Sequence, residues 1–124
     1  MDDKRKFSRV PFVVKAQIDW QGKALTGEVS NLSLRGMFVH VPEAIAVGEK
    51  LASTLQLTGD SSDLKVTIVA KVVRADAKGI GIEFEQMDLD SFIHLRNIVA
   101  YNSGNADLID QEFMNFIKHR GFAI

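Results

Sequence analysis

The sequence predicts an all-β domain of six short antiparallel strands, forming a barrel or a sandwich, with helical structure after it. Two patterns predict this class. Apolar and polar residues alternate with period two through most of residues 10–86, and turn residues interrupt the alternation at short intervals. These intervals are too short for crossover helices, which disfavours a parallel α/β sheet. After Phe84, apolar residues recur at helical spacing instead.

The composition is that of one soluble domain. The chain has 124 residues, of which 46% are hydrophobic and 25% charged, and its formal net charge is -1. A charge so close to zero gives no overall field to attract a nucleic-acid polymer or an acidic membrane. The chain has no cysteine, no apolar run long enough to span a bilayer and no signal-peptide pattern at its charged N-terminus. These features predict a cytoplasmic protein without membrane insertion.

The first three strands are predicted from the alternation and from the turns between them. The apolar face of the first strand is formed by Phe12, Val14, Ala16, Ile18 and Trp20. Gln21 and Gly22 then offer a tight turn, because glycine reaches positive φ without strain. The return strand is expected over residues 25–30. A third strand follows the sequence NLSLRG (residues 31–36) and ends at Pro42, which cannot donate a ladder hydrogen bond.

Three further strands are expected at residues 51–57, 64–72 and 80–84. Turn clusters at residues 59–63 and 77–79 separate them. The second of these strands has a long alternation, with an aliphatic residue at every second position. One of its faces is therefore expected in the core.

Two amphipathic helices are predicted after the last strand. Asp88 or Asp90 caps the start of the first helix, and Gly104 ends it. The second helix begins near Asp107, and its apolar stripe is formed by Ile109, Phe113, Phe116 and Ile117. Such a stripe either covers an open end of the barrel or meets another subunit. The sequence leaves both alternatives open.

Residues for catalysis or metal binding do not follow a recognised pattern. The three histidines, His40, His94 and His119, fall on different predicted elements and lack metal-ligand spacing. Ser33 has no GxSxG elbow around it. The GIG sequence at residues 79–81 is not followed by the helix that a phosphate-binding loop needs. We therefore expect neither an enzyme nor a metal or cofactor site.

A basic cluster precedes the first strand. Four cations lie within six residues there, namely Lys4, Arg5, Lys6 and Arg9. In most proteins such a cluster is a solvated terminal arm. Here Phe7 lies inside the cluster and favours contact with a surface. Arg5 and Arg9 are four residues apart, so one turn of backbone brings both guanidinium groups to one side. Arginine suits phosphate oxygens and the O6/N7 edge of guanine.

The NLSLRG sequence has complementary chemistry. The side chain of Asn31 donates to and accepts from a base edge, that of Ser33 donates to phosphate, and Gly36 lets backbone approach a ligand. An Asx or Ser turn between two strands explains the same three residues. Taken alone, neither this sequence nor the basic cluster decides between a structural role and a binding site.

Together the two sequences resemble the motifs of the PilZ domain, the bacterial receptor module for cyclic di-GMP. RKFSR (residues 5–9) has the form RxxxR, NLSLRG has the form [DN]xSxxG, and GIGIEF (residues 79–84) is similar to the end of that domain. The resemblance implies a six-stranded antiparallel PilZ-type β-barrel over residues 1–87, in which residues 1–9 form a flexible basic arm. Residues 88–124 would then be a C-terminal extension of one or two α-helices.

The resemblance also implies a ligand site. Arg5 and Arg9 are expected to contact guanine edges and phosphates of cyclic di-GMP. Asn31 and Ser33 would contact a base and a phosphate, and Gly36 would permit close approach of the ligand.

Two further positions bear on this site. Lys4 precedes the RxxxR motif, where the family's residue bears on whether one ligand or a stacked pair is bound. Arg35 lies at an open position of the second motif, where it either adds a phosphate contact or is a solvated charge.

The implied function is that of a cyclic di-GMP receptor, in which the ligand orders the N-terminal arm and a protein partner reads the change. The family implies roles in bacterial motility, adhesion or biofilm control. The C-terminal helices are the expected surface for a homodimer or another partner. The alternative is an adaptor that has lost nucleotide binding and acts only as a protein-interaction domain. The net charge of -1 and the lack of an aromatic strip disfavour a barrel for single-stranded nucleic acid.

Overall fold

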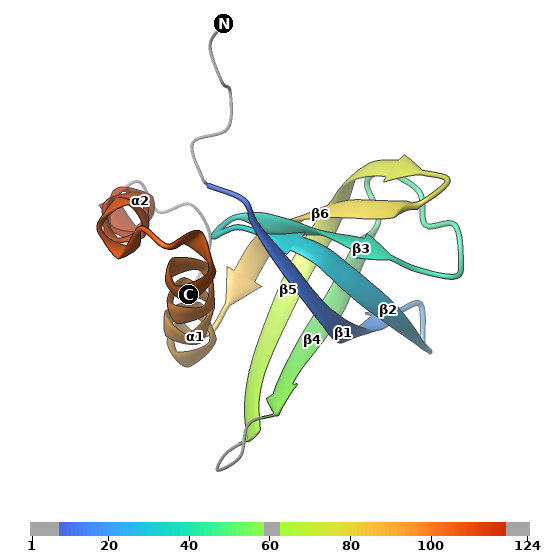
Figure 1. Ribbon diagram of the computed structural model, residues 1–124. Helices are drawn as coiled ribbons and strands as arrows, with labels where there is room; N and C mark the ends of the chain where they lie inside the picture. Colours follow the sequence, from blue (N-terminus) through green and yellow to red (C-terminus); the bar gives the residue numbers. More distant parts are fainter. Residues whose placement is uncertain (1–7, 59–62, 119–124) are drawn as a thin grey trace, which may run out of the picture.

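The alternating part of the sequence forms six β-strands in the computed structural model, which describes residues 8–58 and 63–118. The strands are β1 (Val10–Trp20), β2 (Lys23–Leu32), β3 (Gly36–His40), β4 (Lys50–Thr58), β5 (Asp63–Asp76) and β6 (Gly79–Met87). They pair antiparallel in the order β1-β2-β3-β6-β5-β4, and β4 pairs with β1, which closes the barrel (Figure 1). The predicted six-stranded antiparallel barrel is confirmed.

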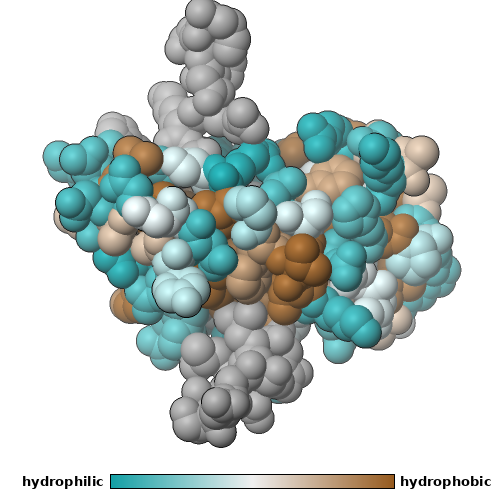
Figure 2. Space-filling model, viewed as in Figure 1, coloured by the Kyte–Doolittle hydropathy of each residue, from teal (hydrophilic) through white to brown (hydrophobic). Residues whose placement is uncertain are grey.

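The core lies inside the barrel and is made by the apolar members of the alternation. Fully buried aliphatic residues come from every strand, among them Ile18, Val29, Val39, Leu55, Ile68 and Ile82. Removing each such side chain from water contributes about 1.5–3 kcal/mol to folding. The polar members face outward, and Figure 2 shows hydrophilic residues over most of one face of the molecule, with smaller apolar groups among them.

Three strands continue well past the ends that the alternation predicted, and one of them is β6, which was expected over residues 80–84 but ends at Met87. β2 continues to Leu32, so Asn31 is part of the strand and only residues 33–35 form the connection to β3. β5 continues to Asp76, and its register with β6 shifts between Val72 and Arg74. The alternation of β2 and β5 is broken by a register shift, between Val29 and Asn31 in β2 and between Val72 and Arg74 in β5, while the backbone pairing continues past it.

Two helices follow the barrel, as predicted. In α1 (Leu89–Ser103), the carboxylate of Asp88 accepts a hydrogen bond from the backbone N–H of Ser91 at 3.1 Å, which caps the helix start. Gly104 ends the helix in the left-handed conformation, with φ of 71°. The second helix, α2, spans Ala106–Lys118.

The helices lie together beside one end of the barrel (Figure 1). α1 packs against β5 and β1, and its residues Phe92, Leu95 and Val99 join the barrel core. Phe116 of α2 is also buried and lies edge-on to Phe92, with ring centroids 5.4 Å apart. Of the two alternatives left open by the sequence, the described residues show cover for the barrel. A dimer through the helices stays a prediction.

Neither helix in the described part of the chain is long and apolar enough to cross a membrane.

Candidate functional site

The two motifs meet at the start of β1 and the end of β2. Arg9 immediately precedes β1, and Asn31 lies opposite Pro11 in the β1–β2 pairing. The Nη1 group of Arg9 donates a hydrogen bond of 2.9 Å to the Oδ1 atom of Asn31. One predicted residue of each motif is therefore in direct contact, on the outside of the barrel.

Ser33 shapes the connection between β2 and β3. Its backbone N–H donates to the carbonyl of Gly36 at 2.9 Å, and its hydroxyl donates to the same carbonyl at 3.2 Å. The Oγ atom also accepts from the backbone N–H groups of Arg35 (3.2 Å) and Gly36 (3.1 Å). Ser33 is only 3% exposed. To donate to a phosphate, the hydroxyl proton would have to leave the Gly36 carbonyl.

Gly36 is required by the packing of the barrel itself. It begins β3 and pairs with Glu83 of β6. A β-carbon at position 36 would lie 2.4 Å from the carbonyl oxygen of Ile82, which is far inside van der Waals contact. The close approach that the sequence assigned to a ligand is made here by the backbone of β6. Whether a ligand also approaches Gly36 stays a prediction.

Arg35 points toward the neighbouring strand. Its Nε atom lies 3.2 Å from a carboxylate oxygen of Glu83, and both side chains are substantially exposed. An exposed pair of this kind contributes little to stability. The backbone carbonyl of Arg35 also accepts a hydrogen bond of 2.8 Å from the N–H of Phe84, which fixes the turn against β6.

Lys4 and Arg5 lie outside the described residues, so their predicted roles stay predictions. Ser8, which lies between Arg5 and Arg9 in the motif, is described. Its N–H and its hydroxyl donate to the two carboxylate oxygens of Glu112 in α2, at 2.9 and 2.6 Å. The sequence analysis did not identify this contact. No local signal points to it, because the two residues are 104 positions apart.

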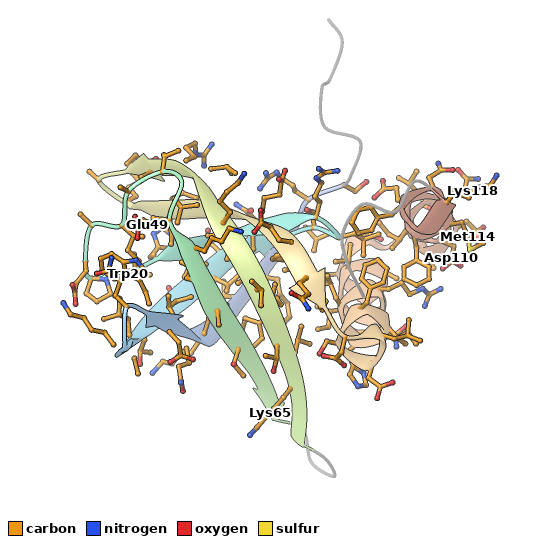
Figure 3. All side chains as sticks on the ribbon, turned by 180° about the vertical axis from the view of Figure 1, so that it is seen from behind. Trp20, Glu49, Lys65, Asp110, Met114 and Lys118 are labelled. Carbon is orange, nitrogen blue, oxygen red and sulfur yellow. The ribbon has the colours of Figure 1, made fainter. Side chains whose placement is uncertain are left out.

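The far end of the barrel is held by structural contacts. Trp20 donates through its indole N–H to Glu49 at 2.9 Å, and Figure 3 shows this pair away from the helices. Nearby, hydrogen bonds from the backbone N–H groups of Lys78 and Gly79 lower the pKa of the Asp76 carboxyl. This carboxylate is accounted for by its turn.

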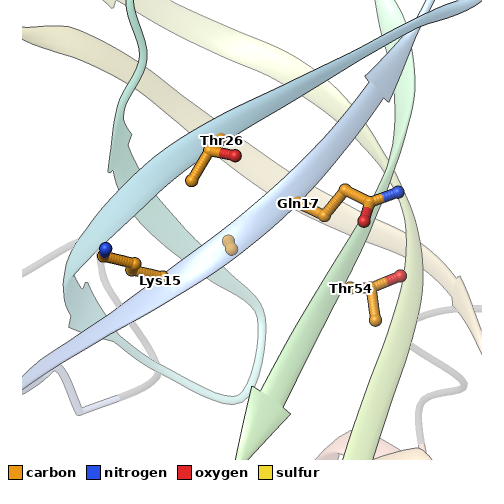
Figure 4. Close-up of a pocket in the computed structure, with 5 residues that line it drawn as sticks. Lys15, Gln17, Thr26 and Thr54 are labelled. Carbon is orange, nitrogen blue, oxygen red and sulfur yellow. The ribbon is translucent and has the colours of Figure 1, made fainter.

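A hollow of about 190 Å³ on the outer face of the barrel also has several polar side chains in its lining. It is lined by side chains from three neighbouring strands, among them Lys15, Gln17, Thr26 and Thr54 (Figure 4). Lys15 supplies one cation there, whereas the contact of Arg9 with Asn31 combines a guanidinium with an amide. Among the described residues there is no cluster of His, Asp and Glu side chains suited to a metal ion. The two motifs therefore remain the better candidate site.

Comparison with known proteins identifies the family to which this chain belongs. The model of the PilZ domain matches residues 3–101. Among solved structures, the chain is similar to the inhibitor of motility MotI/DgrA of Bacillus subtilis, with a TM-score of 0.66 and 18% identity. That match covers 76% of this chain and 48% of the other, so the chain spans about half the length of the B. subtilis protein.

Two PilZ domains have the same fold. The PilZ domain of YcgR from Escherichia coli, determined with c-di-GMP, has a TM-score of 0.64 and 15% identity, and the match covers 82% of this chain and 92% of that one. The PilZ domain of CeSA from a cellulose-synthesising bacterium has a TM-score of 0.54 and 17% identity, with 74% and 94% covered. With both motifs in place and the family model matching most of its length, the chain belongs to the PilZ domain family.

Proposed function

We propose that this protein is a receptor for cyclic di-GMP and that it binds the ligand at the RxxxR and [DN]xSxxG motifs. The observation that carries this proposal is the 2.9 Å hydrogen bond between Arg9 and Asn31, which joins the two motifs on the outside of the barrel. The relative with a similar fold from E. coli, the YcgR PilZ domain, was determined with this ligand.

The chemistry of these side chains suits the ligand. Cyclic di-GMP carries two phosphates and two guanines, so a site for it needs both anion donors and groups that read a guanine edge. Arginine offers a planar fork for either target, and the asparagine amide offers one donor and one acceptor edge. Hydrogen bonds to charged groups contribute about 1.5–3 kcal/mol each. Four or five of them, less the cost of ordering the arm, leave about -8 kcal/mol, a micromolar site.

The signal would pass from the N-terminal arm to the helices. Arg9 is already held at Asn31, and ligand phosphates would bind it there, draw Arg5 onto the barrel and order the arm. Ser8 lies between these arginines and is bound to Glu112 of α2, so a movement of the arm changes a contact of the helix. A partner or a second copy would read this change on exposed apolar residues of α2, of which Met114 is 56% exposed and Leu108 is 41% exposed.

The processes proposed for the protein follow from its relatives. The B. subtilis protein with a similar fold is an inhibitor of motility, which favours motility control. Biofilm control and a cytoplasmic location are proposed on the same family grounds. The protein would act by binding rather than by catalysis.

One observation favours the alternative of an adaptor without nucleotide binding. The hydroxyl of Ser33 and the position of Gly36 are already used by the turn and by the contact with β6. A β2–β3 turn that serves only the fold would need the same serine and glycine. The side chains to be tested are therefore the arginines of the RxxxR motif, because the described contacts give Arg9 no buried role in the fold.

Titration calorimetry with cyclic di-GMP separates the two functions. Wild type is expected to bind with micromolar affinity, and Arg9→Ala is expected to bind at least tenfold more weakly. Lys15→Ala is the matched control, because Lys15 is an exposed cation on the adjoining strand β1 and lies outside the motifs. No heat of binding with wild type would overturn the receptor proposal and support the adaptor. Equal loss in the control would mean that general charge, and not the motif, drives binding.

A further inference from the structure

A row of paired residues crosses the outer face of the barrel next to the motifs. Asn31 of β2 pairs with Phe38 of β3, Phe38 pairs with Gly81 of β6, and Gly81 pairs with Arg74 of β5. Phe38 faces outward, because its neighbours along β3, Met37 and Val39, are buried in the core and side chains alternate along a strand.

Phe38 is nevertheless only 6% exposed. The guanidinium of Arg74 covers it, with the Cζ atom 5.1 Å from the centre of the ring. The ring of His40 lies edge-on at 5.2 Å on another side. The guanidinium of Arg74 thus packs on the outward-facing ring of Phe38, and we call this position the seat of Arg74. The arrangement gives a favourable cation–π interaction.

Because Gly81 has no side chain, it leaves room for the side chain of Arg74 to cross β6 and reach Phe38. A β-carbon at position 81 would lie 3.4 Å from the β-carbon of Arg74 and 4.0 Å from the Cδ1 atom of Phe38. A branched side chain there would occupy the space between the two residues. The shift in register between Val72 and Arg74 also belongs to this arrangement, because it sets which residue of β5 lies opposite the glycine.

The carboxylates near Arg74 have other main partners. That of Asp76 accepts hydrogen bonds from the backbone of the turn at Lys78 and Gly79, which lower the pKa of this carboxyl more than the nearby charge of Arg74 does. That of Glu83, on the same strand as Gly81, is paired with Arg35. Within the described residues Arg74 forms no ion pair, and it is exposed to solvent. Its guanidinium therefore has the phenyl ring beneath it and solvent beside it.

Arg74 and Arg9 flank the same pair of residues. β2 lies between β1 and β3 in the barrel, so Arg9 reaches Asn31 from one side while Arg74 lies over Phe38 on the other. Adjacent strands are about 5 Å apart, so the seat of Arg74 is one strand spacing from Asn31. A ligand bound at Asn31 and extending across β3 would meet this guanidinium.

We propose that Arg74, seated on Phe38, is a further contact for the ligand and stacks on one of its guanine bases. This inference rests on the proposed function. A planar guanidinium held on an aromatic ring is ordered before the ligand arrives, and its free face suits a purine. The contact adds a group that reads a base on the side of Asn31 opposite Arg9, and neither motif includes this group.

Calorimetry with cyclic di-GMP tests the inference with variants of β5. Arg74→Ala is expected to lower the affinity at least fivefold, and Arg74→Lys is expected to lose a similar factor, because lysine keeps the charge but not the planar group. Arg74→Gln keeps much of the cover over Phe38 and is the variant to use if alanine unfolds the barrel. Lys65→Ala is the matched control, since Lys65 is an exposed cation on the same strand, near the opposite end of the barrel (Figure 3).

The outcomes separate this inference from the proposed function. If the wild type binds cyclic di-GMP and Arg74→Ala or Arg74→Gln binds it with the same affinity, the contact with Arg74 is wrong and the receptor proposal stands. Wild-type affinity in Arg74→Lys overturns stacking. Absence of binding in wild type overturns both. Loss in the three Arg74 variants, with the Lys65→Ala control within twofold of wild type, supports the contact.

Discussion

Ser8 is bound through both its N–H and its hydroxyl to the carboxylate of Glu112, at 2.9 and 2.6 Å. This contact joins the RxxxR motif to α2, two segments at opposite ends of the chain. The rest of α2 reaches the barrel through the buried residues Ile109 and Phe116 and through α1. A change at the arm therefore has a short route to the helical surface that we propose a partner reads.

The first prediction concerns this route. In wild type, cyclic di-GMP is expected to change hydrogen exchange both in residues 8–12 and in α2. In Glu112→Ala the change in α2 should be lost while the change near Arg9 remains, because the carboxylate that connects the two segments is gone. Gln111→Ala is the control, as Gln111 is an exposed neighbour on α2. A ligand-dependent change in α2 that persists in Glu112→Ala would show that the signal takes another path.

The second prediction concerns the coupling of Arg9 and Asn31. Each single substitution, Arg9→Ala and Asn31→Ala, is expected to weaken binding of cyclic di-GMP about tenfold, the loss of one charged hydrogen bond. The double variant should lose clearly less than a hundredfold, because each residue positions the other through their 2.9 Å hydrogen bond. Calorimetry on the three variants measures this coupling. Fully additive losses would mean that the two side chains act independently.

The strands and the helix ends were predictable because their signals are local. Period-two alternation sets which face of a strand enters the core, and β1 to β6 lie where the alternation placed them. Gly104 ends α1 as predicted, and of the two predicted candidates for the start, Asp88 and Asp90, it is Asp88 that caps the helix. The ends of β2 and β5 were not predictable from the pattern, because a register shift near each end breaks the period-two alternation while the backbone pairing continues.

The candidate site was predictable only in part, since the order of the motifs indicated which segments meet but not how their side chains are arranged. The structure brings Arg9 to Asn31, as two motifs acting on one ligand require. The need for glycine at position 36 depends on the carbonyl of Ile82, in a strand that joins β3 only after folding. The seat of Arg74 on Phe38 likewise depends on pairing across three strands. Such contacts leave no spacing in the sequence by which to recognise them.

The third prediction concerns the fold requirement at Gly36. Gly36→Ala is expected to lower the free energy of unfolding by about 1–3 kcal/mol, because the added methyl group meets the Ile82 carbonyl at 2.4 Å and the strands must separate locally. Chemical denaturation measures the change. Gly22→Ala, with open space around the β-carbon but a φ of 78°, should cost about 1 kcal/mol through backbone strain alone. If Gly36→Ala is as stable as wild type, the barrel accommodates the methyl group and a ligand becomes the better reason for the glycine.

The last prediction concerns Asp88, whose carboxyl pKa is lowered by hydrogen bonds from the side chain and then the backbone of Ser91. A group with a lowered folded pKa stabilises the fold above its unfolded pKa, near 3.8, and this contribution is lost as the pH falls through the folded value. At pH 7, Asp88→Ala should cost about 1 kcal/mol, the usual loss of an N-cap. Asp88→Asn keeps a capping oxygen without a titrating group, so its stability relative to wild type should improve as the pH is lowered below 4. Thermal unfolding of the three proteins between pH 3 and pH 7 measures both effects. Parallel pH profiles for wild type and Asp88→Asn would show that this carboxylate does not contribute to the acid sensitivity of the fold.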